Sequence, residues 1–171
     1  MRKILRLAVA ACFLAGLFTA GSAITANATP TADSATVSKV AISGGLSTQA
    51  RSWCCRLFKN QATGLWIDDS FEYGLRTFNY NASDFQKWNI TDWNDQTHEM
   101  KNVATGRCID DSVEFGLRAF PCNSTKFQSW YWQNWADGTT EFKNQATGRC
   151  MDNYYNLRAV QCDTSTSQSW W

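Results

Sequence analysis

Short alternating runs of apolar and polar residues fill the chain from residue 53 onward, and turn-forming residues separate them. None of these runs has the spacing of an amphipathic helix, whereas such alternation is typical of β-strands. In the middle of the chain, a first predicted strand ends at residues 105–106 and a second covers residues 107–112. Gly116 opens a third strand and Trp130 precedes a fourth. The pattern therefore predicts an all-β structure.

The chain also repeats itself about every 42 residues. A Lys-Asn-x-Ala-Thr-Gly motif occurs three times, at residues 59–64, 101–106 and 143–148. Each copy leads to a Gln-x-Trp triplet, and the triplets are Gln86 to Trp88, Gln128 to Trp130 and Gln168 to Trp170. The first two triplets are 42 residues apart, and the third repeat is two residues shorter. We expect about four strands in each repeat.

Three repeats of this length are expected to close around one shared core. A similar period occurs in β-propellers, but a propeller needs at least four blades and this chain has three copies. Closure also removes the exposed edges that small sheets would otherwise present. The predicted core contains three layers of equivalent positions, which are Phe58, Met100 and Phe142, then Ile67, Ile109 and Met151, then Leu75, Leu117 and Leu157.

The first 28 residues are predicted to be a signal peptide. Three basic residues precede an apolar run at 7–18, and Ala26-Asn27-Ala28 offers a cleavage site. The apolar run is too short to span a bilayer, and no later stretch is long enough. Residues 29–52 are rich in Thr, Ser and Ala and are predicted to be a linker or propeptide. The folded domain is predicted at 53–171, with lobes at 53–95, 96–137 and 138–171.

Composition agrees with export. All nine tryptophans and six of the seven cysteines lie at 53–171, and an even cysteine count in an exported domain predicts disulfides. Removing the leader leaves 13 basic and 15 acidic residues, a net charge of −2 with His98 neutral. This balance excludes the basic surface of a nucleic-acid-binding protein. We therefore expect a secreted, extracellular protein.

The three Gln-x-Trp triplets, together with Cys108-Ile109-Asp110 and Cys150-Met151-Asp152, resemble those of ricin-B-type lectin domains. The resemblance covers residues 53–171. It implies a β-trefoil with pseudo-threefold symmetry and one possible shallow sugar pocket in each lobe. The pairings Cys108 with Cys122 and Cys150 with Cys162 also fit that family.

A disulfide between Cys108 and Cys122 on antiparallel strands predicts a register in which opposite residue numbers sum to 230. Asp110 is then opposite Phe120, and Ser112 is opposite Arg118. Side chains at alternate positions share a face, so one surface carries a carboxylate, a ring and a guanidinium. These groups suit a sugar, because the polar ones hydrogen-bond hydroxyls and the ring packs on C–H groups. The predicted carbohydrate-binding residues are Asp68, Arg76 and Phe78, then Asp110, Arg118 and Phe120, then Asp152 and Arg158.

Other interpretations of these residues stay open. Asp110 and Arg118 can form a simple ion pair, with Phe120 covering the disulfide. Sugar-binding lobes of the family carry Gln where this chain has Arg76, Arg118 and Arg158. They carry Asn where this chain has Phe85, Phe127 and Ser167. Val160 replaces the ring in the third lobe, where Tyr154 or Tyr155 is a possible substitute. The alternative function is a trefoil that has lost sugar binding and recognises a protein.

The remaining motifs predict structure rather than catalysis. The three glutamines of the triplets are expected to satisfy backbone groups in turns, with the triplet tryptophans also structural. The pairs Asp68-Asp69, Asp110-Asp111 and Asp152-Asn153 point to opposite faces of a strand, so we predict no metal. We expect no enzyme activity and no cofactor, since the lone His98 has no repeated partner. In the first lobe, Trp66 and Tyr80 occupy the cysteine positions and can stack. Cys54 and Cys55 are free, bonded to each other, or linked to another chain.

Overall fold

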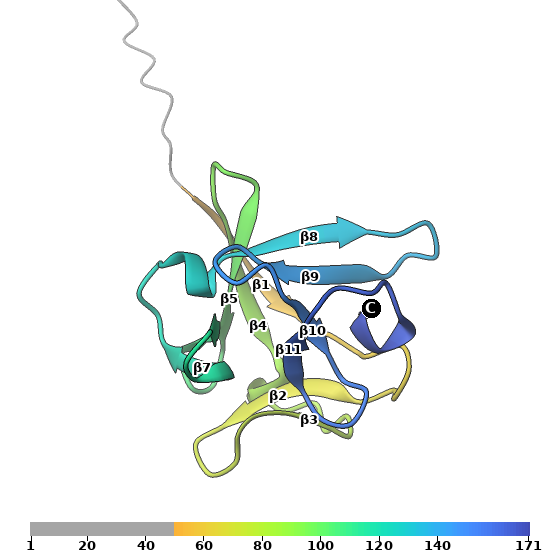
Figure 1. Cartoon of the computed structure of the whole chain (residues 1–171). Helices are drawn as coiled ribbons and strands as arrows, with labels where there is room; N and C mark the ends of the chain where they lie inside the picture. Colours follow the sequence, from red (N-terminus) through yellow and green to blue (C-terminus); the bar gives the residue numbers. More distant parts are fainter. Residues whose placement is uncertain (1–49) are drawn as a thin grey trace, which may run out of the picture. The chain divides into compact units, whose positions relative to one another are not determined.

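The computed structural model describes residues 50–171, so the predicted signal peptide and nearly all of the predicted linker lie outside the described residues. Within this range the chain forms eleven strands (Figure 1), three short 3-10 helices and no other helix. The strands are β1 (Arg51–Arg56), β2 (Trp66–Ser70), β3 (Gly74–Phe78), β4 (Trp88–Asp92), β5 (Thr97–Asn102), β6 (Arg107–Ser112), β7 (Gly116–Pro121), β8 (Trp130–Asn134), β9 (Thr140–Asn144), β10 (Cys150–Asp152) and β11 (Arg158–Val160). The 3-10 helices are η1 (Asp84–Gln86), η2 (Lys126–Gln128) and η3 (Thr166–Gln168).

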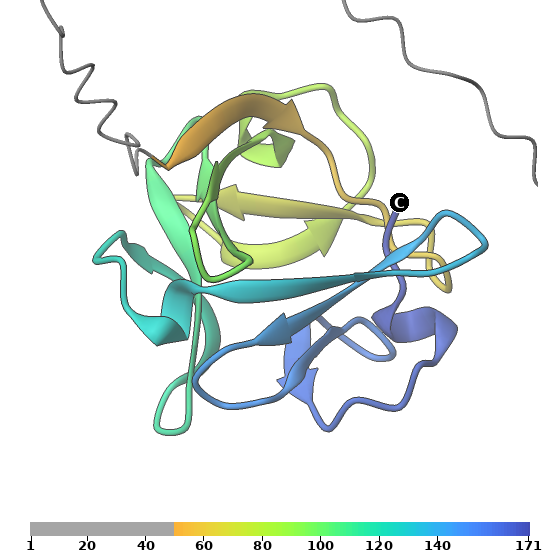
Figure 2. The same cartoon turned by 90° about the horizontal axis from the view of Figure 1, so that it is seen from above.

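The first and fourth strands of the repeats close into a ring, as the repeat predicted. β1, β4, β5, β8 and β9 pair in that order, all antiparallel. Trp170 completes the ring by bridging Thr140 in β9 to Asn60, which follows β1. The hairpins β2–β3, β6–β7 and β10–β11 are the second and third strands of each repeat. Seen from above, the three repeats occupy three sectors around a common centre (Figure 2). The predicted all-β architecture is confirmed, and its arrangement is a β-trefoil.

The shared core is built from equivalent residues of the three lobes. The first two predicted layers are fully buried, and the three leucines of the third layer are partly buried against them. The tryptophans of the three triplets are also fully buried. Each indole Nε1 donates to the carbonyl of a core residue in the second strand of its own lobe: Trp88 to Ile67 at 3.3 Å, Trp130 to Ile109 at 3.1 Å and Trp170 to Met151 at 3.2 Å. A buried indole N–H needs such an acceptor.

The glutamines of the triplets hold the loop that follows each third strand. Gln128 accepts from the backbone N–H of Asn123 at 2.8 Å and donates to the carbonyl of Pro121 at 3.0 Å. Gln86 and Gln168 make the equivalent pairs of hydrogen bonds. All three are fully buried, and they satisfy backbone groups at the end of the third strand and in the loop that follows it.

The predicted register of the β6–β7 hairpin was wrong by two residues. Asp110 is opposite Arg118 and Ser112 is opposite Gly116, so opposite numbers sum to 228. The hairpin loop sets this register: it has three residues, and it ends at Gly116, whose φ of 68° is readily adopted only by glycine. Cys108 is therefore opposite Phe120, and its disulfide reaches Cys122 diagonally, with 5.1 Å between Cα atoms. A shift of two residues leaves every side chain on its predicted face.

The second residue of each of the pairs Asp68-Asp69, Asp110-Asp111 and Asp152-Asn153 joins neighbouring lobes. Asp111 accepts from Arg149 Nε at 3.0 Å and from Thr147 Oγ1 at 2.5 Å. Asp69 is bonded in the same way by Arg107 and Thr105. At the third boundary Asn153 donates to Thr63 Oγ1 at 2.7 Å, and Leu65 stands where the other boundaries have arginine. Loss of the carboxylate and loss of the guanidinium thus occur together.

The difference between the Asp–Arg boundaries and the Asn–Leu boundary predicts what happens when residues of one kind replace those of the other. Arg149→Leu leaves the fully buried Asp111 carboxylate without its cation, and we expect a loss of about 3–5 kcal/mol in the free energy of unfolding. Arg149→Leu combined with Asp111→Asn reproduces the chemistry of the third boundary and should recover most of that loss. Denaturant unfolding of the two variants and the parent protein measures the difference. A double variant as unstable as the single one would contradict this account.

Candidate functional site: hollows on the hairpins of the first two lobes

The hairpin of each lobe brings an aspartate and an arginine together, at positions predicted from the sequence. Arg76 Nε lies 3.0 Å from Asp68 Oδ1, and Arg118 Nε lies 3.0 Å from Asp110 Oδ1. In the third lobe, Arg158 Nε lies 3.1 Å from Asp152 Oδ1. Each pair consists of directly opposite residues on antiparallel strands, which is why their side chains meet.

Two aromatic rings hold each arginine in the first two lobes. The Arg118 guanidinium carbon lies 4.4 Å from the centre of the Phe115 ring and 4.2 Å from that of Phe120. In the first lobe, Tyr73 and Phe78 are each 4.4 Å from the guanidinium carbon of Arg76. Such cation–π contacts orient a planar guanidinium. Phe78 and Phe120 thus pack against the arginines, and their predicted contact with sugar stays a prediction.

A hollow of about 470 Å³ lies beside the second of these pairs. Asp110 and Arg118 line it together with Phe115 and Phe127, and Phe120 is not among its walls. The equivalent hollow of the first lobe, about 290 Å³, is lined by Asp68, Arg76, Tyr73 and Phe85 among others. Sugar-binding lobes of the ricin-B family carry Asn at the positions of Phe85 and Phe127, and here these positions supply an apolar wall instead. The sequence carried this signal in Phe85 and Phe127, which precede the triplet glutamines.

The carboxylates of these two hollows keep one oxygen free of hydrogen bonds from residues 50–171. Asp110 and Asp68 each use Oδ1 to accept from arginine, and Oδ2 accepts no hydrogen bond from residues 50–171. Both side chains are nearly buried, with 2% of Asp68 and 4% of Asp110 exposed. A partly desolvated acceptor beside an aromatic wall can bind a neutral donor such as a hydroxyl group.

The third lobe differs because its own residues occupy the carboxylate. Asp152 Oδ1 accepts from the backbone N–H of Tyr154 at 3.1 Å in addition to Arg158. Its Oδ2 accepts from Ser167 Oγ at 2.6 Å. Of the two tyrosines considered as substitute rings, Tyr155 lies 5.6 Å from the guanidinium carbon of Arg158. The third site therefore has both its aspartate oxygens satisfied internally.

The structure also gives the arrangement of the cysteines. Cys108 is bonded to Cys122 and Cys150 to Cys162, with 5.1 and 4.9 Å between Cα atoms. Of the open possibilities for Cys54 and Cys55, the structure has a bond between the two. Trp66 and Tyr80 lie 5.0 Å apart between ring centres, at the place of the missing disulfide in the first lobe.

A buried glutamate lies against each of the two lobe disulfides. Glu99 accompanies Cys108 and Cys122, and Glu141 is its equivalent beside Cys150 and Cys162. Burial raises the pKa of Glu99, while nearby Lys101 opposes the shift. Burial also raises the pKa of Glu141. The side-chain atoms are close enough to surround an ion, but sulfurs bonded in a disulfide are not the thiolates that a metal needs.

Comparison with known proteins shows similarity of fold. No protein-family model matches the sequence, and no curated protein matches it. Among solved structures, the designed three-fold symmetric protein ThreeFoil is similar, with a TM-score of 0.61, 16% identity, and coverage of 67% of this chain and 94% of that one. SeviL bound to asialo-GM1 saccharide has a TM-score of 0.59 and 13% identity, with coverage of 68% and 93%.

Larger proteins contain similar domains. The exo-β-1,3-galactanase 1,3Gal43A from Clostridium thermocellum has a TM-score of 0.63 and 19% identity, and the match covers 68% of this chain and 29% of the galactanase. The match to a mosquitocidal holotoxin covers only 17% of the toxin. The chain thus corresponds to a minor part of these proteins. At these identities the comparisons define the fold, and the protein is a β-trefoil.

The raised pKa of Glu99 predicts how stability depends on pH. A carboxyl group whose pKa is higher in the folded state favours folding below its unfolded pKa of about 4.3, and this contribution is lost as pH rises through the folded pKa. Glu99→Gln removes the titration, so its stability relative to the parent protein should improve between about pH 4 and pH 7. Denaturant unfolding at several pH values tests this, with the exposed Glu72→Gln as control. A constant difference across that range would contradict it.

Proposed function

We propose that this protein is a secreted carbohydrate-binding module, a lectin of the ricin-B type, whose first two lobes bind sugar residues of a glycan. The observation that carries the proposal is the free Oδ2 of Asp110 in a hollow walled by Phe115 and Phe127. Asp68 has equivalent surroundings in the first lobe, where Tyr73 and Phe85 are the walls.

The chemistry of the hollow matches that of a pyranose ring. The free carboxylate oxygen accepts a hydrogen bond from a sugar hydroxyl, and such charge-assisted bonds are stronger than neutral ones. Arg118 uses Nε for Asp110, which leaves its other guanidinium N–H groups as donors to sugar oxygens. The rings of Phe115 and Phe127 offer apolar faces to C–H groups. We assign no particular monosaccharide, because arginine and phenylalanine replace two polar family ligands in each of these lobes.

The comparisons support a binding role. One similar trefoil, SeviL, has been solved with the saccharide of asialo-GM1, and another forms part of an exo-β-1,3-galactanase. We assign the present domain no catalytic residue, since its hollows pair each carboxylate with arginine. No helix within residues 50–171 is long and apolar enough to cross a membrane. The disulfides and the signal peptide expected at 1–28 support an extracellular location.

Protein recognition is the second candidate function. Aromatic and aliphatic side chains stand out around the same hollows, with 72% of Phe71, 82% of Val113 and 59% of Phe115 exposed. Exposed apolar groups of this kind are used in protein interfaces. A glycan array on the chain without residues 1–28 distinguishes the two functions, since binding to no glycan would favour a protein partner.

The three lobes are expected to bind unequally. Asp110→Ala and Asp68→Ala remove the free acceptor of their hollows, and each should weaken sugar binding at its own lobe by about 10-fold or more. Asp152→Ala is the matched control, because that carboxylate is already occupied by Ser167 and Tyr154. Calorimetry with a sugar identified on the array measures the effects. Equal losses in the three variants would show that the internal hydrogen bonds of the third lobe do not block it.

Two competent lobes on one rigid trefoil should bind polymers better than single sugars. A shallow hollow buries little of a monosaccharide, whereas a second contact occurs at high effective concentration and can raise avidity by about 100-fold. Asp68→Ala should therefore remove most retention on an immobilised polysaccharide while leaving the monosaccharide affinity of the second lobe unchanged. Affinity chromatography and calorimetry together test this. Full retention of the variant would contradict a bivalent mode of binding.

A further inference from the structure

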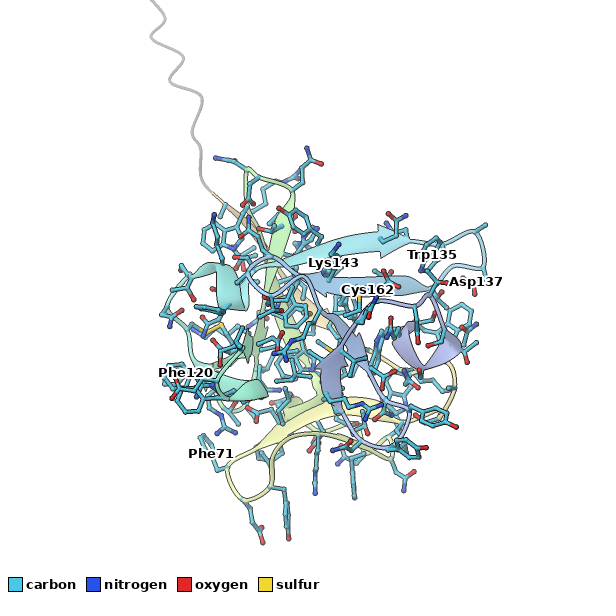
Figure 3. All side chains as sticks on the ribbon, viewed as in Figure 1. Phe71, Phe120, Trp135, Asp137, Lys143 and Cys162 are labelled. Carbon is cyan, nitrogen blue, oxygen red and sulfur yellow. A yellow bond between two sulfur atoms is a disulfide. The ribbon has the colours of Figure 1, made fainter. Side chains whose placement is uncertain are left out.

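Two further hollows, together called the groove, share the side chain of Trp135 at the β8–β9 hairpin, away from the hollows described above. One part, about 520 Å³, is lined by Tyr131, Gln133, Glu141 and Lys143 among others. The other, about 350 Å³, is lined by side chains around the hairpin turn, including Asp137. Trp135 lines both parts. Figure 3 shows Lys143, Trp135 and Asp137 following one another along the hairpin, with Phe71 and Phe120 at the opposite edge of the view.

The register of the hairpin explains why these side chains share one surface. Tyr131 is opposite Lys143 and Gln133 is opposite Glu141, so all four lie on the same face. Phe142, at the alternate position, is fully buried in the core. The groove is therefore the outer face of the hairpin, and its floor is Glu141.

Glu141 has an unusual position for an outward-facing carboxylate. It is only 7% exposed, and its Oε2 is buried without a hydrogen-bond partner among residues 50–171. Buried acceptors of this kind are normally satisfied, and burial raises the pKa of this carboxyl group. Oε2 itself has almost no exposed surface, so a ligand in the groove would donate to the other carboxylate oxygen, Oε1, which is not among the buried atoms and accepts no hydrogen bond from residues 50–171.

The other walls indicate the chemistry of that ligand. Trp135 and Tyr131 are 37% and 41% exposed, so each offers part of a ring face. Beyond Trp135, Asp137 and Gln61 are hydrogen-bonded to each other, and Thr164 and Thr166 add hydroxyl groups. Apolar ring faces alternating with neutral and charged hydrogen-bonding groups match a chain of pyranose rings. The groove is also too polar for an apolar helix or strand.

We propose that this groove binds an oligosaccharide segment, which crosses Trp135 and donates one hydroxyl to Glu141. The proposal rests on the carbohydrate-binding function proposed above, but it does not depend on the hollows of the lobes. It adds a site that takes several consecutive sugar residues, whereas each lobe hollow takes one.

The equivalent β4–β5 hairpin shares part of this arrangement, because Trp93 and the hydrogen-bonded Asp95 and Gln145 stand where the β8–β9 hairpin has Trp135, Asp137 and Gln61. Glu99 there also has a buried Oε2 without a partner among the described residues, so burial of the glutamate is a feature of the repeat. Asn89 and Thr91 replace Tyr131 and Gln133, so that face lacks the tyrosine ring. Glu99→Gln is therefore a control for Glu141→Gln with the same effect on the scaffold.

Calorimetry of the chain without residues 1–28 tests the groove with three pentasaccharides: cellopentaose, xylopentaose and β-1,3-galactopentaose. The double variant Asp68→Ala and Asp110→Ala should no longer bind monosaccharides but should still bind at least one of the pentasaccharides. Trp135→Ala and Glu141→Gln should each lower the affinity for that pentasaccharide by about 10-fold, as expected for loss of a ring contact or a charge-assisted hydrogen bond. Glu99→Gln should leave its affinity unchanged.

Two results would contradict the proposal that the groove binds an oligosaccharide without contradicting the proposal that the lobes bind sugar. One is monosaccharide binding by the parent protein with no pentasaccharide retained in the double lobe variant. The other is equal pentasaccharide affinity in Trp135→Ala, Glu141→Gln and Glu99→Gln. Absence of all sugar binding by the parent protein would overturn both proposals. Melting temperatures of the variants identify any loss that comes from unfolding.

Discussion

The hydrogen bond from each buried triplet tryptophan to the second strand of its lobe is the contact on which the rest of the trefoil depends. The acceptors are the carbonyls of Ile67, Ile109 and Met151, and the next residue in each case is the aspartate of the site. One bond therefore fixes the inward residue in the core and the outward residue in the hollow. Because a hairpin of this size cannot bury its apolar face alone, the three lobes share one core, and the sites inherit its symmetry.

The loop before each tryptophan then determines what the site can bind. The triplet glutamine clamps the backbone of this loop, which fixes the residue that precedes it. In the second lobe that residue is Phe127, an apolar wall that leaves the carboxylate oxygen free. In the third lobe it is Ser167, whose hydroxyl occupies the same oxygen. Sites built on one scaffold thus differ because a single side chain competes with the ligand for one acceptor.

Much of the fold followed from the sequence, because threefold repetition identifies equivalent positions without any structure. The core layers were predicted from the repeat, the second strand of the middle lobe from alternation, and the faces of the hairpin from alternation together with the Cys108–Cys122 pairing. The register failed because the length of the β6–β7 loop was taken from the disulfide, which joins Cys108 to a residue beyond its opposite partner. The side chains were still assigned to the correct faces, because a register error of an even number of residues does not move a side chain to the other face. The packing of Phe78 and Phe120 against the arginines was not predicted, because alternation places a side chain on a face but does not say which neighbour it packs against.

The sequence also contained a signal for the contacts between lobes, which was not used to predict them. Asp69 is bonded to Arg107 and Asp111 to Arg149, while Asn153 accompanies Leu65 at the corresponding positions. Two boundaries have the Asp–Arg combination and the third has Asn–Leu, so the two positions differ together among the repeats. This is expected for residues in direct contact. The two residues change together because an unpaired buried carboxylate is strongly destabilising. Internal repeats can therefore report contacts between lobes. They reveal little about ligands, because a ligand imposes no such pairing between positions of the same chain.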